Sequence, residues 1–129
     1  MTPAAGSPAD HPAASSDEAR PLDGLVVVDL TRVLAGPYCT RLLSDLGARV
    51  IKIERPVEGD EMRRNPHQIE GGREDQSTYF ARVNAGKESV AVDLSRPEGR
   101  EVVLALARHA DVFIENFAPG VVGRLGLDY

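Results

Sequence analysis

The stretch from Leu25 to Glu54 constrains the fold most strongly, because it joins two apolar runs through a helical segment. The first run, residues 25–30, is apolar except for Asp29, which is typical of a strand covered on both faces in a parallel sheet. The second run, residues 48–53, is rich in β-branched side chains. The stretch therefore predicts a strand–helix–strand unit with a right-handed crossover.

The segment between these runs carries the start and stop signals of a helix. Gly36-Pro37 opens it, because proline is tolerated in the first turn of a helix. Gly47 is suited to end it, because glycine enters the left-handed conformation without a steric clash. The three- and four-residue spacing of its apolar side chains places them on one face, and we expect Cys39 to be buried there: Cys39, Leu42, Leu43 and Leu46.

The second half of the chain repeats this pattern. Residues 88–94 alternate apolar and polar side chains, which predicts a strand, and residues 111–115 predict another. Between them, Ser95 to Glu98 matches a capping box that starts a helix running to about Arg108. We expect four side chains of that helix segment to face the sheet: Val102, Val103, Leu106 and His109. Two such units predict an α/β fold with a Rossmann-like, doubly wound, mainly parallel sheet.

The remaining segments are polar. Residues 1–20 contain no Leu, Ile, Val or aromatic residue, so we expect a disordered tail before a domain at 21–129. This tail lacks the basic start and apolar core of a secretory signal. Residues 55–76 predict a long loop, in which Gly59-Asp60 and Arg63-Arg64 either face a ligand or are simply solvated. Residues 78–83 predict one short helical turn.

Composition excludes several classes of function. A net charge of −5 argues against nucleic acid or an anionic membrane surface as a partner. The apolar runs are far shorter than the roughly 18 residues of a membrane span. A single cysteine cannot form an intramolecular disulfide and fits a cytoplasmic location. No Cys/His cluster has the spacing of metal ligands, so we expect no metal.

The ends of the predicted strands indicate a ligand site, because ligands of open α/β sheets bind outside the carboxyl ends of their strands. These ends are residues 31–36 and 54–55 in the first half of the chain. The helix start beyond Gly36 and the guanidinium of Arg55 both suit phosphate groups. The residues therefore predict a site for a phosphorylated, nucleotide-like ligand. Asp29 and Asp45 are interpreted as structural residues.

A family resemblance covers residues 21–129. The chain contains PLDGLVVVDLTRVLAGP (21–37), LGARVIKIE (46–54), GDEMR (59–63), NAGKESVAVDL (84–94), PEGR (97–100) and DVFIENFAPGVVGRLGL (111–127). In this order and approximate spacing, these segments resemble the N-terminal part of the class III CoA-transferases. That family includes the formyl-CoA transferases, the carnitine CoA-transferases and the related α-methylacyl-CoA racemases.

The resemblance implies a function and a set of contacts. It implies an enzyme that moves CoA from an acyl-CoA thioester to a carboxylic acid, within a larger, interlaced homodimer. It also implies these CoA contacts: Val33, Leu34, Ala35, Arg55, Val92, Asp93, Leu94, Ser95, Asn116, Phe117, Ala118 and Arg124. The family's nucleophilic aspartate would lie beyond Tyr129. We therefore expect no catalytic residue in this chain and no activity from it alone.

Two other readings of the sequence stay open. The chain is also compatible with a fragment of an α-methylacyl-CoA racemase. The alternative from a different class is a free-standing CoA- or nucleotide-binding module that performs no chemistry. A dinucleotide oxidoreductase is less favoured, because the glycines at 120, 123 and 126 lack the G-x-G-x-x-G spacing.

Overall fold

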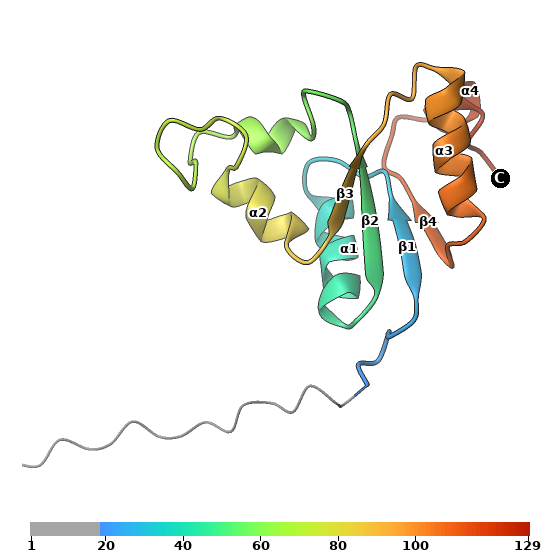
Figure 1. Ribbon diagram of the computed structural model, residues 1–129, viewed down its shortest axis with the longest axis horizontal. Helices are drawn as coiled ribbons and strands as arrows, with labels where there is room; N and C mark the ends of the chain where they lie inside the picture. The colour runs from blue at the N-terminus through green and yellow to red at the C-terminus, as the bar shows by residue number, and fades with distance from the viewer. Residues whose placement is uncertain (1–18) are drawn as a thin grey trace, which may run out of the picture.

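A parallel sheet of four strands, ordered β3-β2-β1-β4, forms the centre of the protein (Figure 1). The computed structural model describes residues 19–129, so nearly all of the predicted tail lies outside the described residues. The strands are β1 (Val26–Asp29), β2 (Arg49–Glu54), β3 (Glu88–Ala91) and β4 (Val112–Ile114). In this register Val27 lies opposite both Val50 and Val112. The chain thus places β2 and β3 on one side of β1 and β4 on the other.

Helices connect the strands, and a further helix follows β4. They are α1 (Ala35–Asp45), α2 (Thr78–Asn84), α3 (Pro97–Ala107) and α4 (Val121–Leu125). The predicted loop at 55–76 also contains the short 3-10 helix η1 (Glu61–Arg64). Gly47 has φ of 113° and follows the end of α1 as predicted. None of the described helices has the length and apolarity that a membrane crossing requires.

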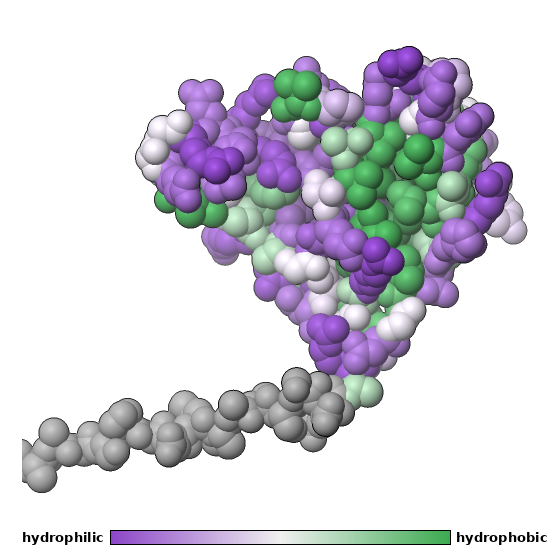
Figure 2. Space-filling model, in the orientation of Figure 1, coloured by the Kyte–Doolittle hydropathy of each residue, from purple (hydrophilic) through white to green (hydrophobic). Residues whose placement is uncertain are grey.

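Alternate side chains of the strands point to opposite faces and build two apolar clusters. Val27 and Val50 pack with Leu43 of α1 on one face. Val28 and Ile51 pack with Val103 of α3 on the other. Figure 2 shows apolar side chains gathered on the second face beside α3, with polar side chains around them. Helices therefore cover both faces, which confirms the predicted doubly wound α/β fold.

Helix α1 packs with a different face from the one that its apolar spacing suggests, although Leu43 of that face does pack against the sheet. Its buried residues are Gly36, Pro37, Thr40 and Ser44. Cys39 is exposed, so the prediction that it is buried is wrong. Leu42 and Leu46 are each 45% exposed. The reason lies in the sheet beneath, where buried Asp29 requires a polar partner and accepts a hydrogen bond from Thr40 of α1.

The start of α3 also differs from the prediction. Arg96, rather than Ser95, is the N-cap residue, and its side chain makes no capping hydrogen bond. The hydroxyl of Ser95 instead donates to Oδ1 of Asp93 at 2.6 Å. The predicted capping box is therefore wrong. Asp93 Oδ1 also accepts a hydrogen bond from the Ser95 N–H at 2.9 Å. An aspartate side chain readily accepts from the backbone two residues ahead, and this turn holds the Ser95 hydroxyl beside Asp93.

Only part of the predicted buried face of α3 is correct. Val103 is fully buried and Leu106 packs against the same cluster, as predicted. Val102 is 47% exposed and His109 is exposed, so these two predictions are wrong. The helix approaches the sheet along the line of Gly99, Val103 and Leu106, and Val102 lies off this line. His109 lies beyond the helix, which ends at Ala107.

We predict that Gly99→Ala destabilises the fold. A Cβ at this position would lie 2.0 Å from the carbonyl oxygen of Asp93, so α3 would have to move away from the segment that follows β3. We expect a loss of about 1–3 kcal/mol in the free energy of unfolding, measured by urea denaturation. Gly71→Ala is the matched control, because nothing lies within 4 Å of a Cβ there. Equal effects at both glycines would contradict the close packing of α3.

Candidate functional site

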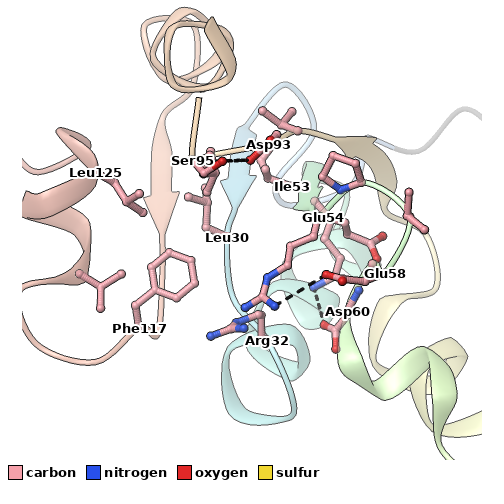
Figure 3. A pocket seen from close by; sticks show the side chains of 18 residues that line it. Leu30, Arg32, Ile53, Glu54, Glu58, Asp60, Asp93, Ser95, Phe117 and Leu125 are labelled. Carbon is pink, nitrogen blue, oxygen red and sulfur yellow. Dashed lines mark hydrogen bonds and ion pairs between the residues drawn. The ribbon is translucent and has the colours of Figure 1, made fainter. Parts of the chain in front are cut away.

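A pocket of about 660 Å³ lies at the carboxyl ends of the four strands. The segments after β1, β2, β3 and β4 all contribute to it, together with α4. In Figure 3, Phe117 and Leu125 lie on one side of the pocket, and Glu54, Glu58 and Asp60 lie on the other. Its position matches the strand-end site that the sequence predicts for a ligand.

Half of the predicted contact residues line this pocket. They are Arg55, Val92, Asp93, Leu94, Ser95 and Phe117. The loop residues Gly59 and Asp60 line it as well. The other predicted contacts are not among its lining residues: Val33, Leu34, Ala35, Asn116, Ala118 and Arg124. Val33 to Ala35 are exposed where the chain turns into α1, and Val33 has φ of 72°, which is rare for a β-branched residue.

The pocket also contains residues that the sequence analysis did not identify. They are Leu30, Lys52, Ile53, Pro56, Val57, Glu58, Val121 and Leu125, whereas Arg32 and Glu54 lie within the strand ends predicted at 31–36 and 54–55. One of them carried a signal. Lys52 is a charged residue between two isoleucines in a strand predicted to be buried, and such a residue needs a buried partner. The others depend on how distant segments meet, which their local sequence does not encode.

The pocket combines an apolar lining with charged side chains. Its apolar lining includes Leu30, Ile53, Val92, Phe117 and Leu125. The guanidinium carbon of Arg32 lies 5.3 Å from the centre of the Phe117 ring. Arg55 is well exposed, and its Nη1 lies 4.0 Å from Oε2 of Glu58. The pocket can therefore present both apolar surface and positive charge to a ligand.

The loop that carries Arg55 is held by a carboxylate at the end of β2. Glu54 accepts hydrogen bonds from Nε and Nη2 of Arg63, each at 2.7 Å. It also accepts from the Ser89 hydroxyl at 2.6 Å and from the Asp60 N–H at 2.9 Å. One carboxylate thus ties together β2, β3, η1 and the loop between Arg55 and Asp60.

Two buried ion pairs lie beside this carboxylate. Nζ of Lys52 is 3.0 Å from Oδ2 of Asp60 and donates to the Thr31 carbonyl at 2.8 Å. Nζ of Lys87 is 3.1 Å from Oδ2 of Asp29, and both side chains are at most 1% exposed. Asp29 also accepts from the hydroxyl of Thr40 at 2.6 Å. These pairs satisfy charges that would otherwise be costly to bury.

The surroundings of these groups shift their pKa values. Burial disfavours the charge on Glu54, but hydrogen bonds from Arg63, Ser89 and the Asp60 backbone outweigh it and lower the pKa of Glu54 to about 2. Burial lowers the pKa of Lys87 to about 8, although the Asp29 carboxylate favours the ammonium. Burial likewise opposes the charge on Asp29, but Lys87, Thr31 and Thr40 hold the pKa of Asp29 below its usual value. All three groups are therefore charged at neutral pH.

Comparison with known proteins identifies the family. The family model of CoA-transferase family III matches residues 22–129. The chain belongs to CoA-transferase family III. This CoA-transferase family III chain is 46% identical over 120 residues to the succinyl-CoA:glutarate CoA-transferase of Mus musculus. It is 50% identical over 109 residues to the acetyl-CoA:oxalate CoA-transferase of Acetobacter aceti.

The chain spans only part of these relatives. The matches cover 92% and 84% of this CoA-transferase family III chain, but 27% of the length of each relative. A solved CAIB/BAIF family protein from Brucella suis has the same fold, with a TM-score of 0.78 and 49% identity over 87% of this chain and 30% of that one. A hypothetical protein from Mycobacterium tuberculosis gives a TM-score of 0.75 and 43% identity, over 85% of this chain and 29% of its own.

We predict that Glu54 stabilises the family III fold in a pH-dependent way. Folding lowers its pKa from an ordinary 4.5 to about 2, so its contribution is complete above about pH 4.5 and is lost as the pH falls toward 2. Glu54→Gln should lower the free energy of unfolding at pH 7 by roughly 2 kcal/mol and should flatten the acid decline. Denaturant unfolding at a series of pH values measures both effects.

The matched control for Glu54 is Glu88→Gln. Glu88 also accepts two hydrogen bonds from an arginine, Arg49, but both side chains are exposed. Exposed pairs contribute little to stability, so the loss at neutral pH should be much smaller than at Glu54. Equal losses at the two glutamates would contradict the role of burial.

We predict that Lys87→Met is among the most destabilising substitutions in the chain. It would leave the fully buried carboxylate of Asp29 without its counter-charge. Breaking a buried pair in this way costs about 3–5 kcal/mol, measurable by urea denaturation with circular dichroism. The double variant Asp29→Asn/Lys87→Met removes both charges and should recover part of this loss. A double variant no more stable than Lys87→Met would argue against the ion pair as the cause.

Proposed function

We propose that this chain supplies the coenzyme A-binding part of an acyl-CoA:carboxylate CoA-transferase. The observation that carries the proposal is the pocket at the strand ends, formed within the segment that matches the family. Relatives that cover most of the chain are named as transferases that act between CoA thioesters and carboxylic acids such as oxalate and glutarate. CoA is here a substrate rather than a resident cofactor.

The pocket has groups that suit each part of CoA. The apolar lining at Leu30, Ile53 and Val92 offers contact to the pantetheine arm, which is long and weakly polar. Phe117 offers an aromatic face on which adenine can stack. Arg55 offers an exposed guanidinium, whose planar donors match phosphate oxygens. We infer that these residues bind and orient the thioester.

The nucleophile of the reaction is proposed to lie outside this pocket. CoA transfer requires a carboxylate that attacks the thioester and then carries CoA to the acceptor acid. Asp29, Glu54 and Asp60 are buried, and each is held in an ion pair with an arginine or a lysine. A carboxylate fixed in this way is a poor nucleophile. We therefore assign these three acids to holding the strand ends in place. As the resemblance implies, we assign the attacking aspartate to a part of the enzyme beyond residues 1–129.

Binding of CoA to the full chain tests this proposal. Isothermal titration calorimetry should show saturable binding of CoA, and Arg55→Ala should weaken that binding about tenfold by removing a charged hydrogen-bond donor. Arg108→Ala is the matched control. It removes the same charge from the end of α3 that leads into β4, away from the pocket, and should leave affinity unchanged. Absence of CoA binding by the unmodified chain would overturn the proposal.

A further inference from the structure

Asn116 links the segment after β4 to the segment after β1. Its Oδ1 accepts a hydrogen bond from the N–H of Arg32 at 2.9 Å, and its Nδ2 donates to the carbonyl of Arg32 at 2.8 Å. Both ends of one side-chain amide are thus engaged by the backbone of one residue, 84 positions away in the sequence. The link lies at the junction of β1 and β4, where the strand order of the sheet reverses.

This link fixes the backbone of a residue whose side chain lines the pocket. The guanidinium of Arg32 lies against the ring of Phe117, and Figure 3 shows both side chains facing the same space. Within residues 19–129, no carboxylate lies at ion-pair distance from this guanidinium. Arg63, by contrast, is fully engaged by the carboxylate of Glu54.

A half-buried arginine without a counter-charge is suited to receive an anion. Its planar donors match the oxygens of a phosphate or a carboxylate, and contact with an aromatic ring leaves those donors free at the guanidinium edge. The flanking apolar residues exclude water from part of its surroundings, which strengthens an ionic hydrogen bond. The position of its backbone is set by Asn116 rather than by the ligand.

We propose that Arg32 is an oxyanion-binding residue of this pocket, and that Asn116 is a positioning residue that acts through Arg32. This inference rests on the proposed function and extends it. The oxyanion has two possible sources: a phosphate of CoA, or a carboxylate carried by the acyl group of a dicarboxylic CoA thioester. The resemblance implies that Asn116 itself contacts CoA, whereas its amide groups are already used by Arg32.

The test compares four probes by isothermal titration calorimetry with the full chain. They are CoA, pantetheine, acetyl-CoA and succinyl-CoA. If Arg32 binds a phosphate, Arg32→Ala should weaken CoA binding about tenfold and leave pantetheine binding unchanged. If it binds the acyl carboxylate, Arg32→Ala should weaken succinyl-CoA by a similar factor and leave acetyl-CoA unchanged. Arg32→Lys, which keeps the charge but loses the planar fork, should recover part of either loss.

A double-variant cycle tests the positioning role of Asn116. Asn116→Ala should reduce the same discrimination between probes, but it should have no further effect in the Arg32→Ala background. Circular dichroism confirms that each variant is folded, and Arg108→Ala again controls for loss of charge.

If Arg32→Ala bound all four probes as tightly as the unmodified chain, the inference would be overturned while the proposed function stood. If Asn116→Ala weakened binding further in the Arg32→Ala background, Asn116 would be a direct contact of the ligand rather than a positioning residue. Failure of the unmodified chain to bind CoA would instead overturn the proposed function.

Discussion

The ion pairs beneath α1 are the constraint on which the rest of the structure depends. Asp29 with Lys87, and Lys52 with Asp60, place four charges in the interior at the carboxyl ends of β1 and β2. Each charge needs its partner at hydrogen-bond distance, because an unpaired charge would be expensive to bury. Satisfying them fixes the path of the loop up to Asp60 and the position of the turn before β3. The same requirement explains why α1 buries Thr40, whose hydroxyl donates to Asp29.

The sequence predicted the sheet and its layers well, because a buried parallel strand reads as an apolar run whatever surrounds it. It predicted the orientation of helices less well. The leucines of α1 follow helical spacing, yet the sheet beneath the helix is polar at Asp29 and Lys52, so Leu42 and Leu46 remain on the surface. At α3, Asp93 captured the hydroxyl and the N–H of Ser95, and the helix began after Arg96 instead.

The difference between local and long-range signals also separates the pocket residues that the sequence predicted from those that it did not. Arg55 and Phe117 could be predicted, because they directly follow strands and the strand-end rule needs only local sequence. Arg32 also lies in a predicted strand end, at 31–36, but its link to Asn116, which is 84 residues away, could not be predicted. Hydrogen bonds and ion pairs of this range leave no periodic signal in a single sequence. A charged residue within an apolar strand, as at Lys52, is the local trace that such contacts do leave.

The long-range link between Asn116 and Arg32 affects when the pocket forms during folding. Strand β4 pairs with β1, with Val112 beside Val27, although most of the chain separates the two strands in the sequence. This pairing therefore closes a long loop and is slow to form. The wall that includes Phe117 and α4 therefore exists only after the last strand has docked. Ligand binding is consequently coupled to the folding equilibrium of the whole sheet, and any ligand of the pocket will favour the folded chain by mass action.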